Sequence, residues 1–286
     1  MEDGLSDAWA PKAAVYGLGQ LAIGIAVLRR LERQEPEDAA SGPTLQAWLA
    51  RLARIVAALL LAALALRLLA QTASAFGPHD AWVPGNLRAI ALESRWGHGW
   101  RWQVLAALAM LGASLLIPSR RAGWMIFDAG AIGLAVAIPL LGHAAGSLQR
   151  YGMHALHNLG AAVWVGALGA LVLTAWRPGT PLRGAVPGLV RRFSPVALSA
   201  AAVALASGAI AGLVYAGSWA SLWTTPHGRL LTVKLTGVAV VIACGSMNWR
   251  CVRRGTPPPR LVLTLEWLAA LVVLGLTGAL TETEHP

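Results

Sequence analysis

Three histidines and a methionine lie between two apolar stretches in the middle of the chain. His143 ends one stretch, and Met153, His154 and His157 open the next. A spacing of three places His154 and His157 on one face of a helix, and the short loop makes the two helices antiparallel neighbours. Imidazole binds copper and zinc, and a thioether favours Cu(I). The pattern predicts a copper site, for Cu(I) or Cu(II); the alternative is interfacial histidines satisfied by water and backbone.

Weaker candidate ligands lie elsewhere in the chain, and each also fits an ordinary structural role. Three further histidines flank apolar stretches and would serve as second-site ligands or as loop residues: His79, His98 and His227. Three sulfur-bearing residues share one helical stripe, because their spacing is i, i+3 and i+7: Cys244, Met247 and Cys251. Soft sulfur ligands on that stripe would suit Cu(I) leaving the protein, and the alternative is apolar packing.

The elements that position these side chains are apolar helices. The chain has 286 residues, of which 56% are hydrophobic and 13% are charged, whereas a soluble domain has about 25% charged residues. A bilayer core needs about 20 apolar residues per helix, and the sequence predicts eight such spans, at 9–28, 52–76, 99–118, 123–143, 154–175, 194–217, 229–249 and 261–280. Unpaired backbone groups are too costly in lipid for other structures. We therefore expect an all-α, polytopic bundle that forms a single transmembrane domain over 1–286.

The basic residues predict the orientation of this bundle. Most of the 23 Lys and Arg residues fall in the loops that follow the first, third, fifth and seventh spans. The positive-inside rule places those loops in the cytoplasm and both termini outside. The net charge of +10 is then explained by topology and lipid headgroups, and we expect no nucleic-acid partner. All seven histidines fall on the outward side under this assignment, where an extracytoplasmic ligand would arrive.

Four ionisable residues fall inside the expected spans, where charges are costly and usually face the bundle interior. Asp128 and Glu266 lie in the inner halves of their spans, and Arg67 and Lys234 lie nearer the outer halves. These four would either pair with one another as structural groups or line a path for protons or ions. Lys234 is also close enough to the outer end of its span to extend toward water.

The sequence contains none of the catalytic or nucleotide-binding motifs that would indicate an enzyme. A nucleophile elbow, a zinc-protease motif and a phosphate-binding glycine loop are all missing. We therefore expect a protein that is not an enzyme and has no ATP-driven pump activity of its own. The opening "MEDGLSDAWAPK" is acidic, which argues against a cleaved signal peptide.

Two segments resemble each other within the chain. "SRWGHGWRWQVL" and "TTPHGRLLTVKL" both open an inward-running span, and aligning Gly97 with Gly228 brings Gln103 to the position of Lys234. Duplicated halves are common in transporters. The echo predicts that 52–143 and 194–280 are weakly related halves in parallel orientation.

The second part of the chain, over 144–286, resembles the copper resistance D (CopD) family of bacterial inner-membrane proteins. The matching stretches are "HNLGAAVWVGALGALVL", "RRFSPVALSAAAVALASG", "TTPHGRLLTVKLTG" and "LEWLAALVVLGLTGALTETEHP". This resemblance implies eight helices in the inner membrane and movement of copper from periplasm to cytoplasm. It also implies a periplasmic copper-binding partner of the CopC type, and candidate ligands at His143, His154 and His157, with Met153.

Two other functions are compatible with the same residues. His143 paired with His154 or His157 would supply the axial ligands of a b-type haem, as in a membrane cytochrome. Alternatively, the protein would bind copper without moving it, as a sensor or as a docking platform for a metallochaperone. A haem absorption band and copper flux into sealed vesicles distinguish these functions from transport.

Overall fold

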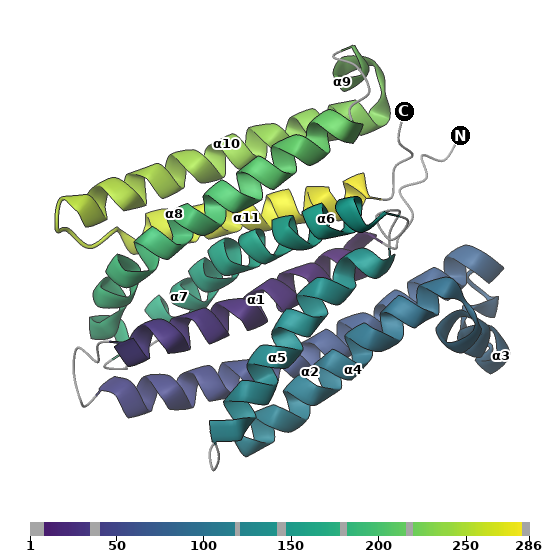
Figure 1. The fold of residues 1–286 in the computed structure, drawn as a ribbon, viewed down its shortest axis with the longest axis horizontal. Helices are drawn as coiled ribbons and strands as arrows, with labels where there is room; N and C mark the ends of the chain where they lie inside the picture. Colours follow the sequence, from purple (N-terminus) through teal and green to yellow (C-terminus); the bar gives the residue numbers. More distant parts are fainter. Residues whose placement is uncertain are drawn as a thin grey trace.

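The computed structural model describes residues 9–34, 41–117, 121–141, 147–177, 182–215 and 220–281, and every element in these ranges is helical. The long helices run roughly along one direction and form an elongated bundle (Figure 1). The first part of the chain contains α1 (Trp9–Gln34), α2 (Ser41–Phe76), η1 (Asp80–Trp82), α3 (Pro84–Arg88), η2 (Ala89–Glu93), α4 (Arg95–Leu116), α5 (Arg121–Ala137) and η3 (Ile138–Leu141). The second part contains α6 (Leu148–Ala161), η5 (Ala162–Gly166), α7 (Ala167–Ala175), α8 (Leu182–Tyr215), α9 (Ser221–Thr224), α10 (Pro226–Arg253) and α11 (Arg260–Leu280).

Seven helices in the described part of the chain are long and apolar enough to cross a membrane: Trp9–Arg33, Gly42–Phe76, Arg121–Leu141, Leu148–Ala175, Gly184–Gly212, Pro226–Arg253 and Arg260–Leu280. These coincide with seven of the eight expected spans, so the all-α, multi-pass prediction is confirmed for them. The eighth, expected at 99–118, lies on α4, which packs against α2 and α5 but is not among the seven. Arg95, Arg101 and Gln103 make the first turns of α4 more polar than the rest of that helix.

Two helices begin well before the apolar segments that predicted them. α2 starts at Ser41 and α8 at Leu182, so Arg51 and Arg191, which fall outside the expected spans 52–76 and 194–217, are helical residues. Both extensions place apolar side chains on one buried face at helical spacing. The buried residues are Leu45, Leu49, Val186, Leu189, Val190 and Phe193. Hydropathy over a bilayer-length window does not detect such amphipathic turns.

α1 lies at the centre of the bundle. It packs against α2 and α5, against α11, and against the η5–α7 part of the helix that runs from Leu148 to Ala175. Its closest approach is at Gly24, where a side chain would overlap the backbone of Gly166, and a side chain on Gly166 would overlap the carbonyl of Gln20. Glycine at both positions therefore allows the two backbones to touch.

The two parts of the chain differ in how their outer helices pack. α4 pairs with α5, and α10 pairs with α11, along much of their lengths. α2 also packs along α4, whereas α8 has little contact with α10. Few residues of α10 are buried, namely His227, Gly228, Leu231, Val241 and Asn248. α8 and α10 are therefore only loosely packed against each other.

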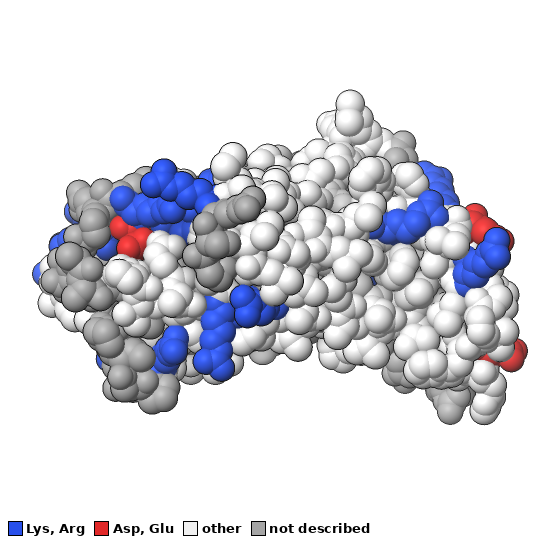
Figure 2. All heavy atoms as spheres, turned by 90° about the horizontal axis from the view of Figure 1, so that it is seen from below, with Lys and Arg blue, Asp and Glu red and all other residues white. Residues whose placement is uncertain are grey.

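Charged side chains gather at the two ends of the molecule and leave a broad uncharged middle (Figure 2). α1 begins and α11 ends at the same end of the bundle, where α3 and α9 also lie (Figure 1). Large apolar side chains are exposed along the middle, among them Leu59, Leu105, Ile132, Val240 and Val272. An uncharged, apolar belt between charged ends is the surface that a bilayer solvates.

Candidate functional site

The candidate copper-binding residues lie on α6, which is held between two neighbours. On one side, Tyr151 Oη donates to the Val136 carbonyl and Asn158 Nδ2 donates to the Ala135 carbonyl, each at 2.9 Å. On the other side, Gly160 lies so close to α8 that a Cβ there would sit 3.0 Å from the Ala200 carbonyl oxygen. α6 is therefore fixed in rotation, and so are the directions in which its side chains leave it.

His157 is held against α8 by one ring nitrogen. Its Nδ1 lies 2.8 Å from the Ala204 carbonyl oxygen. A carbonyl only accepts, so Nδ1 carries the proton and Nε2 carries the lone pair of the neutral ring. The Ser207 hydroxyl lies 3.4 Å from the same nitrogen. Metal-binding histidines usually donate their second N–H to such a partner, which fixes the ring and its tautomer.

Met153 and His154 precede His157 by four and three residues, so all three leave α6 on neighbouring lines of its surface. Each is half-buried. His154 and, on α10, Lys234 lie close enough to His157 to interact with it electrostatically. His143 lies outside the described residues. Among those that are described, no three or more His, Cys, Asp and Glu side chains gather as a metal site, so the four-residue ligand set stays a prediction.

The weaker histidine candidates come from three places in the sequence, before η1, on α4 and on α10. His79 is exposed before η1. His98 is exposed on α4, and its Nε2 accepts a hydrogen bond from Trp102 Nε1 at 3.3 Å. His227 is only 4% exposed and lies in the first turn of α10.

The three sulfur-bearing residues, Cys244, Met247 and Cys251, all lie in the C-terminal part of α10. Cys244 and Cys251 are both free thiols and partly exposed. Met247 is 52% exposed. Their role as ligands stays a prediction.

Asp128 is part of a buried ion pair between α5 and α1. Its Oδ2 accepts from Arg29 at 2.5 Å and from Arg30 at 3.3 Å. The Arg29 guanidinium also lies over the Trp124 ring, 4.9 Å from its centroid. Both members of the Arg29–Asp128 pair are buried, so each neutralises a charge that would otherwise be costly in this position.

Glu266 is as deeply buried as Asp128 but has a different environment. It is 4% exposed, and it accepts hydrogen bonds from Trp164 Nε1 at 3.2 Å and from Asn248 Nδ2 at 2.6 Å. Both donors are neutral, and no basic side chain in the described residues forms an ion pair with it. Sequence reasoning missed Trp164 and Asn248 because neither is close to Glu266 along the chain.

Arg67 and Lys234 belong to different environments as well. Arg67 is buried and donates to Gln103 Oε1 at 3.2 Å, while Gln103 Nε2 donates to the Ala137 carbonyl at 3.3 Å. These bonds connect α2, α4 and α5. Lys234, which the sequence comparison aligned with Gln103, lies on α10, close enough to His157 on α6 to interact with it electrostatically.

Comparison with known proteins identifies the family. The family model for "Copper resistance protein D-like, N-terminal domain" matches residues 8–153, and the model for "Copper resistance protein D" matches residues 187–280. "Copper transport protein CutJ" of Bacillus subtilis (strain 168) is 32% identical over 222 residues, covering 72% of this chain and 40% of that relative. No solved structure matches. Helices, apolar belt and sequence likeness agree, and this multi-pass membrane chain belongs to the copper resistance protein D family.

Proposed function

We propose that this chain binds copper at the periplasmic face of the bacterial inner membrane and carries it toward the cytoplasm. His143, His154 and His157 would capture the ion, with Met153 as a soft ligand. Copper is the substrate, and it would pass inward beside the loosely packed surfaces of α8 and α10. The chain spans about 40% of the length of its curated relative, and a periplasmic copper-binding protein of the CopC type is the proposed donor.

The observation that carries this proposal is the hydrogen bond from His157 to Ala204. It is 2.8 Å long and holds the ring against α8, so that Nε2 keeps its lone pair for an incoming ion. The side chains of His154 and Met153 leave α6 from neighbouring positions on the helix surface. Imidazole and thioether together favour copper over the hard cations Mg²⁺ and Ca²⁺.

The proposed direction rests on the charge at the two ends of the bundle. α1 ends and α2 begins at the end that carries Arg29, Arg30, Arg51 and Arg54, and α10 ends there with Arg253. The opposite end, where α6 and α10 begin, has fewer basic residues and contains the histidines. By the positive-inside rule, the basic end faces the cytoplasm and both termini are periplasmic.

Glu266, rather than Asp128, is the proposed site of proton coupling. Asp128 is held by two arginines, and protonating it would leave Arg29 buried without its counter-charge. Glu266 has only neutral hydrogen-bond partners, so it takes up or releases a proton without breaking an ion pair. Burial makes the charged form of Glu266 less stable. A movement of the surrounding helices that changes this burial would therefore change whether Glu266 binds a proton.

The experiment is copper analysis of the purified protein with and without the α6 histidines. The double variant His154→Ala with His157→Ala should lose bound copper, whereas His98→Ala, on an exposed part of α4, should keep it. Copper uptake into sealed vesicles then separates transport from sensing or docking. An unchanged copper content in the double variant would reject the site, and a haem absorption band in the wild-type protein would favour the cytochrome alternative.

A further inference from the structure

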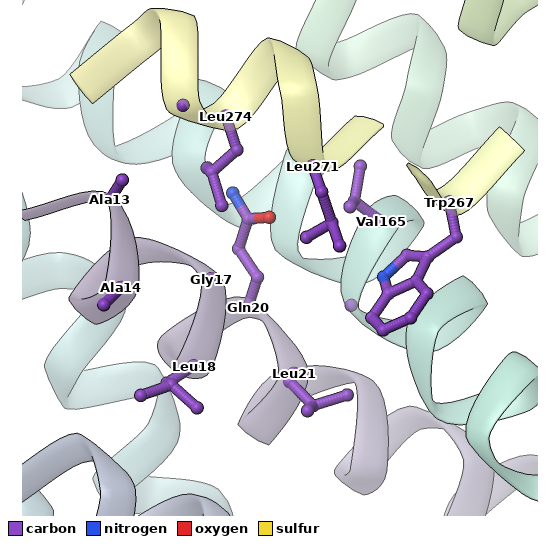
Figure 3. Close-up of a pocket in the computed structure, with 12 residues that line it drawn as sticks. Ala13, Ala14, Gly17, Leu18, Gln20, Leu21, Val165, Trp267, Leu271 and Leu274 are labelled. Carbon is purple, nitrogen blue, oxygen red and sulfur yellow. The ribbon is translucent and has the colours of Figure 1, made fainter. Parts of the chain in front are cut away.

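A pocket of about 390 Å³ lies between α1, η5 and α11. Its walls are almost entirely apolar and include Leu18, Leu21, Leu271 and Leu274 (Figure 3). The ring of Trp267 forms one side. This volume falls in the usual range of small-molecule sites, and the residues that line the pocket come from α1, η5 and α11, not from α6.

One polar side chain extends into this apolar space. Gln20 on α1 is only 7% exposed, and its Oε1 has no hydrogen-bond partner among the described residues. The amide lies between Leu274 and Leu271 in the view of Figure 3. A buried oxygen without a donor costs about 1–3 kcal/mol. A single water is poorly suited to this position, because buried waters usually need 2–4 polar partners.

The depth of Gln20 restricts the kind of molecule that would donate to it. Counted from Trp9, where α1 begins, Gln20 lies about 17 Å along the helix axis at 1.5 Å per residue. That is near the middle of a hydrocarbon core of about 30 Å. The polar atoms of phospholipids stay at the membrane surface. A molecule that reaches Gln20 therefore has to be apolar enough to bring its own hydroxyl into the bilayer centre.

We propose that this pocket binds a membrane-soluble quinol. The flat ring would lie among Trp267, Leu271 and Leu274, with one hydroxyl donating to Gln20 Oε1. Aromatic rings pack favourably against tryptophan at centroid separations of 4.5–7 Å. A quinol combines an apolar ring and tail with a hydroxyl donor, as this depth and lining require. The inference does not depend on copper transport, since it rests on a different cavity.

Two variants test the two parts of the proposal in the complete protein. Gln20→Leu removes the acceptor and keeps the size of the side chain. Gly275→Leu fills the pocket, because Gly275 is one of its lining residues and a Cβ there meets nothing within 4 Å. The matched control is Gly133→Leu on α5, where a Cβ also meets nothing within 4 Å and the pocket is not touched.

The measurement is binding of decylubiquinol to purified protein in lipid nanodiscs without oxygen, with the bound quinol extracted and quantified by its absorbance. We expect saturable binding by wild type and by Gly133→Leu, about tenfold weaker binding by Gln20→Leu, and loss of binding in Gly275→Leu. Decylubiquinone, which lacks the hydroxyl donor, should bind more weakly than the quinol. Unchanged helical circular dichroism in all variants shows that they are folded.

Three results would overturn the proposal. Wild-type affinity in both pocket variants would show that quinol binds elsewhere. Equal affinity for the quinone and the quinol would remove the role of the Gln20 acceptor. Equal affinity for decylbenzene, which has the apolar ring and tail but no polar group, would show that the pocket takes up any apolar molecule.

Discussion

His157 and Ala204 are joined across 2.8 Å by a hydrogen bond from the imidazole Nδ1 to the backbone carbonyl. The bond connects α6 to α8 and fixes the direction of the opposite ring nitrogen. The ring also packs over Gly208, where a Cβ would lie 3.0 Å from His157 Cε1. The position of a proposed copper ligand is therefore set by a helix 47 residues further along the chain.

Substituting Gly208 should weaken copper binding without removing any ligand. In Gly208→Ala the new methyl group pushes the His157 ring away from α8, which stretches the bond to Ala204. Loss of such an orienting contact usually costs 10–100-fold in metal affinity, and we expect about tenfold. Competition with a chelator of known affinity measures the change. Gly212→Ala on the same helix meets nothing within 4 Å, and a loss of the same size there would contradict this explanation.

Breaking the ion pair between Arg29 and Asp128 should destabilise the bundle. Asp128→Ala leaves the Arg29 guanidinium buried without its counter-charge, and removing one partner of such a pair typically costs about 3–5 kcal/mol. The double variant Arg29→Met with Asp128→Leu should recover most of that loss. Unfolding in detergent, followed by loss of helical circular dichroism, gives both values. Arg30→Gln is the control, because its side chain is 63% exposed and it should change stability little.

Neutralising Glu266 should separate copper binding from proton coupling. Glu266→Gln keeps the size of the side chain, and its one amide oxygen can still accept from Trp164. Its NH2 group can donate to Asn248 Oδ1 if the Asn248 amide turns over, since that oxygen has no other partner among the described residues. The protein should therefore fold and hold copper. In proteoliposomes, copper uptake by wild type should respond to an imposed pH gradient, and uptake by the variant should not. Glu93→Gln serves as the control at an exposed carboxyl group, 64% exposed and paired with Arg88 at 3.5 Å. A gradient response that survives in Glu266→Gln would place the coupling elsewhere.

The orientation of the chain in the membrane can be measured by labelling single cysteines that are introduced into a variant without Cys244 and Cys251. Trp82→Cys tests the end with α3, where Trp82 is 70% exposed, and Arg254→Cys tests the exposed turn after α10. A membrane-impermeant maleimide added to intact spheroplasts should label position 82 only. Lysing the cells should make position 254 reactive too. Labelling of position 254 in intact cells would reverse the proposed topology.

The helices were predictable because their apolar lengths match a bilayer. The amphipathic turns at Leu45 and Phe193 were not, because only one face of each turn is apolar and both lie outside the apolar segments. The pair of α6 histidines was predictable from its spacing of three. Its partner at Ala204 was not, since any residue supplies a backbone carbonyl. The same limit applies to Glu266, whose donors are 102 and 18 residues away in the chain. Relatedness of 52–143 and 194–280 stays a prediction.

The glycine contact between α1 and η5 has a mechanical consequence. α1 packs with α2 and α5, the helix from Leu148 to Ala175 packs with α8, and the two backbones meet at Gly24 and Gly166 with no side chain between them. A slide along either helix would drive the bulkier neighbours of the glycines together, whereas a change in crossing angle would not. If these two helices move relative to each other, we therefore expect their crossing angle to change while their backbones stay in contact at this point.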